Sequence, residues 1–220
     1  DAVRILDRGV RYEVRPALGQ KTGFYCDQRD NRALVRELAE GREVLDMFCY
    51  TGGFSLNAAL GGATAVTGVD SSALAVSTAE RNAALNDLED DPRLRFVRAD
   101  AYKFLAEAAA EGRAYDLIVL DPPKLAPNKK ALVRARRKYE RLNAAALRLL
   151  RPGGLLFTFT CSAAMAQSGD FVNMVRDAAG QAGASLTLLR AVGAAPDHCL
   201  NPAYLEGEYL EGALLYRAPP

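Results

Sequence analysis

Asp46-Met47-Phe48-Cys49-Tyr50-Thr51-Gly52-Gly53-Phe54 joins a short apolar run to an apolar helical segment. Residues 43–47 are typical of a buried strand, and residues 54–60 of a helix that ends at a pair of glycines. Gly52 and Gly53 allow the backbone to approach a ligand closely, and the helix presents its N-terminus to that ligand. An ordinary strand-to-helix turn is the alternative. The stretch is not a GxGxxG, so a dinucleotide-binding fingerprint is absent.

The same alternation extends along the chain on both sides of this stretch. Further strands are expected at 65–69, 94–97, 116–120 and 155–160, and further helices at 73–86, 102–110, 132–150 and 170–182. Such alternation predicts an α/β fold with a doubly wound, mostly parallel sheet. Segments 185–192 and 209–216 are expected to add an antiparallel hairpin at the sheet edge, which makes seven strands. Segments 3–6 and 10–14 predict a separate N-terminal β-hairpin.

Composition narrows the class of protein. The 220 residues carry 28 basic and 27 acidic side chains, so the net charge of +1 by itself indicates no partner. Half of the residues are hydrophobic, but no apolar run approaches the length of a membrane span, so no membrane association is expected. The four cysteines are widely spaced and the chain has one histidine, His198, which disfavours a metal site and indicates a reducing cytoplasm.

Four acidic residues stand at the ends of four successive predicted strands. In an open α/β sheet, ligands bind outside the carboxyl ends of the strands. Asp70, 24 residues after Asp46, can accept hydrogen bonds from a ribose diol, and Asp100 is suitably placed for an adenine amino group. Asp121 follows the fourth strand. Each acid could instead cap the next helix, but their joint occurrence favours a nucleotide site.

These residues make the chain resemble class I S-adenosylmethionine-dependent methyltransferases. More narrowly, it is similar to bacterial large-subunit ribosomal RNA cytosine-5 methyltransferases of the RlmI type. The motifs that carry this resemblance are Gly19-Gln20-Lys21-Thr22-Gly23-Phe24-Tyr25, Asp27-Gln28-Arg29-Asp30-Asn31-Arg32, Asp121-Pro122-Pro123-Lys124, residues 139–143, Thr160-Cys161-Ser162 and Glu206-Gly207-Glu208-Tyr209-Leu210. The chain departs from the family pattern at Asp197-His198-Cys199, where proline is expected after histidine.

The resemblance implies S-adenosyl-L-methionine as cofactor, with Tyr25 and Arg29 at its methionine end. The residues assigned to the cofactor are Tyr25, Arg29, Asp46, Phe48, Tyr50, Thr51, Gly52, Gly53, Asp70, Ser71, Asp100, Ala101 and Asp121. We expect residues 1–40 to form a hairpin and helix that pack on a methyltransferase domain at 41–220. Relatives usually carry an N-terminal PUA-like RNA-binding domain, and the start at Asp1 suggests excision from such a longer protein.

The residues after the fourth and fifth strands indicate which atom is methylated. Many amino-group methyltransferases have an aromatic residue after Asp-Pro-Pro to stack on a flipped base, whereas this chain has Lys124. Cys161 can add to C6 of cytosine and so activate C5, with Asp121 supporting the base. Lys124 could stabilise the thiolate or bind a phosphate. A small buried structural cysteine is the alternative.

Eight basic residues lie between Lys124 and Arg141, and within this stretch only Glu140 opposes them. Such a run is often a solvated helix face, but its position after the Asp121–Lys124 loop favours contact with RNA phosphates. The residues assigned to RNA are Lys129, Lys130, Arg134, Arg137, Lys138 and Arg141.

The leading hypothesis is therefore methylation of a cytosine C5 in 23S ribosomal RNA, on RNA or on a large-subunit assembly intermediate. Methylation of a guanine ring nitrogen or of a small molecule is a second hypothesis. A non-catalytic nucleotide- or RNA-binding module is a third, and a nicotinamide dehydrogenase is the weakest. A homodimer is left open.

Overall fold

The computed structural model describes residues 2–17, 23–126, 128–201, 203–204 and 207–219, together with all their side chains except that of Lys129. Residues 19–22 and Glu206, which belong to the resemblance motifs, lie outside this part of the chain. Contacts divide the chain into two compact units. The first comprises Asp1–Asp100 and Ala194–Asp197, and the second comprises Ala101–Gly193 and His198–Pro220. The expected boundary near residue 40 stays a prediction.

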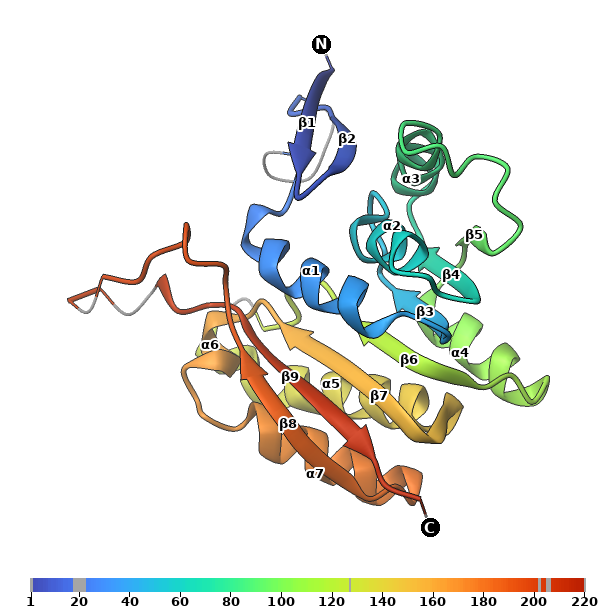
Figure 1. Cartoon of the computed structure of the whole chain (residues 1–220). Helices are drawn as coiled ribbons and strands as arrows, with labels where there is room; N and C mark the ends of the chain where they lie inside the picture. Colours follow the sequence, from blue (N-terminus) through green and yellow to red (C-terminus); the bar gives the residue numbers. More distant parts are fainter. Residues whose placement is uncertain (1, 18–22, 127, 202, 205–206, 220) are drawn as a thin grey trace. The chain divides into compact units, whose positions relative to one another are not determined.

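The N-terminal hairpin of the first unit consists of antiparallel strands β1 (Val3–Asp7) and β2 (Val10–Val14) (Figure 1). Alternate residues of β2 are buried, as a strand with one covered face requires. Two asparagine side chains hold β2 in place, one in α3 (Ala73–Ala84) and one just beyond its C-terminal end. The side-chain oxygen of Asn82 accepts a hydrogen bond from Glu13 N at 2.7 Å, and that of Asn86 accepts one from Arg11 N at 2.9 Å. The hairpin is therefore an integral part of this unit.

Three parallel strands form the sheet of the first unit: β3 (Glu43–Met47), β4 (Ala65–Asp70) and β5 (Leu94–Arg98). Its helices are the short 3-10 turn η1 (Cys26–Gln28), α1 (Arg29–Leu38), α2 (Gly53–Leu60) and α3. The interior of β3 and β4 is almost wholly buried, which explains their continuous apolar character. Because neighbours run parallel, their carboxyl ends meet at one edge of this sheet.

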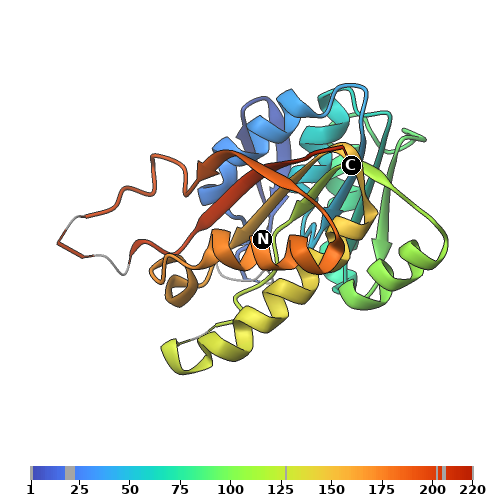
Figure 2. The same cartoon turned by 90° about the horizontal axis from the view of Figure 1, so that it is seen from below.

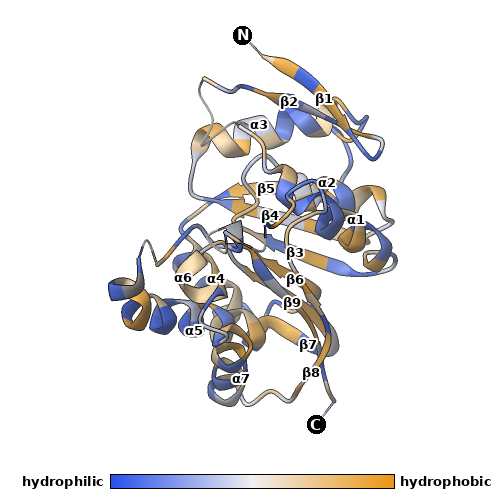
Figure 3. Cartoon of the chain, turned by 90° about the vertical axis from the view of Figure 1, so that its left-hand side faces the viewer, coloured by the Kyte–Doolittle hydropathy of each residue, from blue (hydrophilic) through white to orange (hydrophobic). Residues whose placement is uncertain are grey.

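The second unit contains the parallel pair β6 (Tyr115–Leu120) and β7 (Leu150–Thr160), followed by antiparallel β9 (Glu211–Arg217) and β8 (Leu186–Val192). Its helices are α4 (Ala101–Ala110), η2 (Lys129–Ala131), α5 (Leu132–Leu149), α6 (Ala163–Ala166) and α7 (Phe171–Ala182). Helices α5 and α7 lie side by side below these strands (Figure 2). The strands of this unit are mostly orange in Figure 3, the colour of hydrophobic residues.

The seven strands have the order β5-β4-β3-β6-β7-β9-β8 in a mostly parallel sheet, which confirms the α/β doubly wound class and the additional hairpin. Most element boundaries shift by one or two residues, and two differences are larger. Strand β7 begins at Leu150, five residues before the expected start, because the ladder with β6 continues past an irregularity at 151–154, where Gly153 has a left-handed φ of 83°. Helix α6 was not expected, since its four residues are too few to show a periodic pattern.

Candidate active site

The loop after β3 has an unusual backbone. Phe48, Tyr50 and Gly52 have φ values of 66°, 48° and 84°, so every second residue of the loop is left-handed. Two of these residues are aromatic, and left-handed conformations of bulky residues are strained and concentrate at functional sites. The loop is fixed by hydrogen bonds from Cys49 N to Val69 O (3.0 Å) and from Gly52 N to Cys49 O (2.8 Å).

Asp70 connects this loop to the end of β4. One carboxylate oxygen accepts the N–H of Tyr50 at 3.0 Å, and the other accepts the N–H of Ser72 at 2.8 Å. Its carbonyl accepts the N–H of Ala99 at 3.0 Å, which brings the end of β5 alongside. Ser71 and Asp100, both assigned to the cofactor, are exposed at this edge. The structure thus brings the loop, Asp70 and Asp100 to one edge of the first unit.

Asp46 lies beneath the same loop and is completely buried. One carboxylate oxygen accepts hydrogen bonds from Ser55 N (2.9 Å) and Ser55 Oγ (2.6 Å), which fixes the start of α2. Its other oxygen is buried without a hydrogen-bond partner. Burial raises the pKa of Asp46 to about 7. Burial also raises the pKa of the Cys49 thiol, which disfavours the reactive thiolate there.

Glycine suits positions 52 and 53 because neighbouring side chains leave little room for a Cβ. A Cβ on Gly52 would lie 3.2 Å from the Phe96 ring, and one on Gly53 would lie 3.0 Å from Cδ of Arg32. Just before them, the carbonyl of buried Thr51 accepts a hydrogen bond from Asn82 at 3.0 Å. The backbone of the loop is therefore closely packed from below.

Sequence reasoning overlooked Arg32, although it belongs to one of the motifs quoted above. Its guanidinium is only 4% exposed, pairs with Asp7 at 2.6 Å and donates to the carbonyl of Tyr25 at 2.7 Å. It also lies 4.6 Å from the centre of the Phe24 ring. Arg32 thus joins the hairpin, the segment before η1 and the start of α2. This role is visible only in contacts between residues that are distant in the sequence, which a linear motif does not show.

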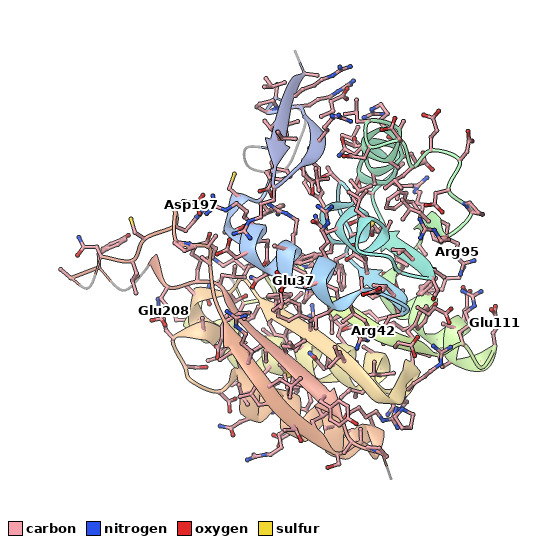
Figure 4. The ribbon with its side chains drawn as sticks, viewed as in Figure 1. Glu37, Arg42, Arg95, Glu111, Asp197 and Glu208 are labelled. Carbon is pink, nitrogen blue, oxygen red and sulfur yellow. The ribbon has the colours of Figure 1, made fainter. Side chains whose placement is uncertain are left out.

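Tyr25 and Arg29, both assigned to the cofactor, make different contacts. The Tyr25 ring lies edge-on to the Tyr50 ring, with centroids 5.4 Å apart. The Arg29 guanidinium pairs with Asp197 at 2.9 Å, and Figure 4 shows Asp197 at the N-terminal end of α1. The segment of Asp197 is attached there by a second bond, from Ala195 N to Asp27 O at 2.8 Å. The segment that departs from the family pattern, residues 197–199, therefore begins at a residue that is bound to the start of α1.

The second unit contains the three residues that the sequence analysis assigned to catalysis, Cys161, Asp121 and Lys124. Cys161 follows the end of β7, is partly exposed, and has its Sγ 3.8 Å from the carbonyl of Pro122. Asp121 is partly exposed and Lys124 is exposed in the loop after β6. The end of β7 and the loop after β6 are thus side by side, as the parallel pairing of these strands requires. Ala101, assigned to the cofactor, is buried as the first residue of α4.

The basic residues of the run that lie on η2 and α5 fall into two groups. Lys130, Arg134, Arg137 and Arg141 are exposed, and Lys138 is partly exposed, which suits a surface for phosphates. The side chain of Lys129 lies outside the described part of the chain. Arg136 belongs to the second group, because it pairs with Glu140 (2.8 Å), Asp170 (2.6 Å) and Asp177 (2.6 Å). Two acidic residues from outside the stretch, Asp170 and Asp177, therefore join Glu140 in opposing the run at Arg136.

Within the described residues there is no cluster of three or more potential metal ligands, and no helix there is both long and apolar enough to cross a membrane. No two cysteines are joined by a disulfide bond.

Comparison with known proteins identifies the class. The family described as S-adenosylmethionine-dependent methyltransferase matches residues 1–204. The chain belongs to this family of enzymes, and the cofactor expected from the sequence, S-adenosyl-L-methionine, is confirmed.

Particular relatives are more informative. The chain is 45% identical over 210 residues to ribosomal RNA large subunit methyltransferase I of Shewanella frigidimarina, covering 96% of this chain and 52% of the relative. Against the Aeromonas hydrophila protein of the same name, identity is 46% over 207 residues, covering 94% and 52%. The chain therefore spans about half the length of these relatives. The crystal structure of SMU.776 complexed with SAH has a TM-score of 0.84 and 28% identity, covering 98% of this chain and 56% of that one.

The first unit fits this cofactor. A left-handed loop with closely packed glycines allows a ligand to approach the backbone, and the carboxylate of Asp70 stands at the end of the adjacent strand, where a ribose diol is expected. The exposed carboxylate of Asp100 follows the next strand. Asp46 fits a supporting role better than direct contact, because it is completely buried.

Proposed function

We propose that this chain is the catalytic part of an RNA methyltransferase that transfers a methyl group to C5 of a cytosine in 23S ribosomal RNA. The observation that carries the proposal is the position of Cys161, a partly exposed thiol next to the loop that holds Asp121 and Lys124. The names of the relatives that match nearly the whole chain support a large-subunit ribosomal RNA substrate.

The chemistry explains why a cysteine is needed. Cytosine C5 is a weak nucleophile, whereas the cofactor supplies an electrophilic methyl group. Addition of the Cys161 thiolate to C6 makes C5 an enamine carbon that can form the new bond to the methyl group. Loss of the C5 proton to a base then restores the C5–C6 double bond, and the C6–S bond breaks to release the thiolate.

Asp121 and Lys124 have supporting roles in this proposal. Asp121 hydrogen-bonds the N3 edge of the cytosine and favours its protonation as the adduct forms. Lys124 is an exposed cation in the same loop, so it favours ionisation of the thiol by lowering the energy of the thiolate. Tyr25, Arg29, the loop at 48–53, Asp70 and Asp100 hold the cofactor.

RNA is bound by the exposed basic residues on α5 that follow the Asp121–Lys124 loop. They contact phosphates, so they contribute affinity that depends on salt and carries little sequence information. The substrate is 23S ribosomal RNA or a large-subunit assembly intermediate, in the cytoplasm. A homodimer stays a prediction.

Methylation of RNA with isotope-labelled cofactor tests this function. Total RNA and large-subunit particles from cells that lack the enzyme are treated with the protein, digested to nucleosides and resolved by mass. Labelled 5-methylcytidine from one position of 23S RNA is the expected product. Labelled methylguanosine, or label only in small molecules, contradicts the proposal and supports one of the alternative methyltransferase reactions.

A further inference from the structure

The residues on either side of Cys161 are turned into the protein. Thr160 and Ser162 are both completely buried, whereas Cys161 between them is partly exposed. Both flanking side chains bond to the same group, the hydroxyl of Tyr139 on α5: Thr160 Oγ1 lies 2.9 Å from it and Ser162 Oγ lies 3.0 Å from it. With positions 160 and 162 fixed inward, the side chain between them is directed away from Tyr139.

The same hydroxyl also holds the loop after β6. Leu125 N–H donates to Tyr139 Oη at 3.4 Å, and Ala126 N–H donates to Ser162 Oγ at 3.1 Å. The network thus joins α5, the end of β7 and the loop that carries Asp121 and Lys124. Its centre, Tyr139, is completely buried, so these bonds are shielded from water.

The direction of the bonds is determined by counting protons. A tyrosine hydroxyl has one proton and can accept further bonds. Thr160 and Leu125 donate to the Tyr139 oxygen, so its own proton is directed to Ser162. Burial raises the pKa of Tyr139, and the neighbouring Cys161 raises it further, so the hydroxyl keeps its proton at neutral pH.

We propose that Tyr139 is a positioning residue for the reaction at Cys161: its hydroxyl directs the thiol outward and holds the Asp121–Lys124 loop beside it. The inference rests on the proposed function for its consequence in catalysis. The placement of the thiol does not depend on that function, because it follows from contacts within the second unit alone.

Tyr139→Phe tests the proposal, since it removes only the hydroxyl. Tyr216→Phe is the matched control: Tyr216 is on β9 opposite Leu155, whereas Cys161 follows Thr160, which pairs with Glu211 at the other end of β9. We expect Tyr139→Phe to lower the single-turnover rate of cytosine methylation 10- to 100-fold, as small misplacements of reacting groups do, and to leave cofactor affinity within twofold. Tyr216→Phe should match the wild type.

Alkylation of Cys161 by iodoacetamide provides a second readout that needs no RNA. Peptide mass spectrometry separates Cys161 from the exposed Cys26 and Cys199. We expect Tyr139→Phe to slow alkylation of Cys161 threefold or more. An alkylation rate equal to or above that of the wild type overturns the proposal. If Tyr139→Phe does not fold, Thr160→Val, which removes one bond of the network, is judged by the same criterion.

The two hypotheses fail in different ways. A wild-type protein that forms no 5-methylcytidine contradicts the proposed function, while alkylation still tests the position of the thiol. A wild-type protein that does form it, with unchanged rates of both methylation and alkylation in Tyr139→Phe, contradicts only the positioning role.

Discussion

The carboxylate of Asp70 accepts the backbone N–H of Tyr50 at 3.0 Å, and this bond joins the end of β4 to the loop after β3. Tyr50 has a φ of 48°, a strained conformation for an aromatic residue, so the bond helps to hold the loop in an otherwise unfavourable shape. Asp70 therefore supports the loop, and we propose that it also binds the ribose of the cofactor.

Asp70→Ala should weaken binding of S-adenosylmethionine tenfold or more. The variant loses charge-assisted hydrogen bonds worth about 1.5–3 kcal/mol each, both within the loop and to the ligand. Isothermal titration calorimetry measures the affinity, with Asp87→Ala at a 94% exposed carboxylate as the matched control. Equal affinities of Asp70→Ala and the wild type would remove Asp70 from the cofactor site.

Asp46 should make the stability of the protein depend on pH. Its pKa is raised from 3.8 to about 7 in the folded state, so the folded state binds more protons than the unfolded state between these values. Stability contributed by the neutral carboxyl is thus present at low pH and lost as pH rises toward 7, by at most about 1.4 kcal/mol per pH unit.

Asp46→Asn should remove this loss, because an amide does not titrate. Denaturant unfolding at pH 5 and pH 8 measures it, and the variant should gain stability relative to the wild type between these two values. Glu211, whose pKa burial also raises to about 7, contributes equally to both proteins and cancels in the difference. A constant difference between variant and wild type at the two pH values would show that Asp46 is ionised throughout.

Arg134→Ala combined with Arg137→Ala should reduce the salt dependence of RNA binding. Each phosphate contact to a single strand contributes about 0.7 to the slope of log affinity against log salt, so the loss of two contacts should lower the slope by about 1.4. Fluorescence anisotropy between low and moderate salt measures the slope. Arg148→Ala with Arg176→Ala, two exposed arginines outside the run, removes the same charge and should leave it unchanged. If both double variants give the same slope, the run is a solvated helix face.

Much of the fold could be predicted because its central strands β3, β4 and β6 are buried on both faces. The apolar run at β3 was placed correctly at both ends, and the glycine loop after it was found because Gly52 and Gly53 are essential to its shape. Strand β9, which lies between β7 and the edge strand β8, was expected to begin two residues too early, since Tyr209 and Leu210 continue its apolar pattern but lie before its first paired residue, Glu211.

The candidate site was less predictable, because its supporting contacts are long-range. Arg136 was counted with the basic run, and its partners Asp170 and Asp177 lie on or next to α7, 34 and 41 residues away. Tyr139 was noted only as the first residue of a resemblance motif, with no role assigned to it, yet it bonds residues 21 and 23 positions further along the chain. Linear spacing cannot distinguish such a residue from an ordinary core aromatic.

The most direct test of the central claim is to trap the covalent adduct at Cys161. Wild-type protein, Cys161→Ala and the control Cys199→Ala, at an exposed cysteine, are incubated with cofactor and target RNA that contains 5-fluorocytosine, whose fluorine cannot leave as a proton does. The wild type and Cys199→Ala should form a protein–RNA adduct resistant to denaturation, whereas Cys161→Ala should bind cofactor and RNA but form neither an adduct nor 5-methylcytidine. Methylation by Cys161→Ala at a rate near that of the wild type would contradict the cytosine-5 mechanism and favour direct transfer to a ring nitrogen.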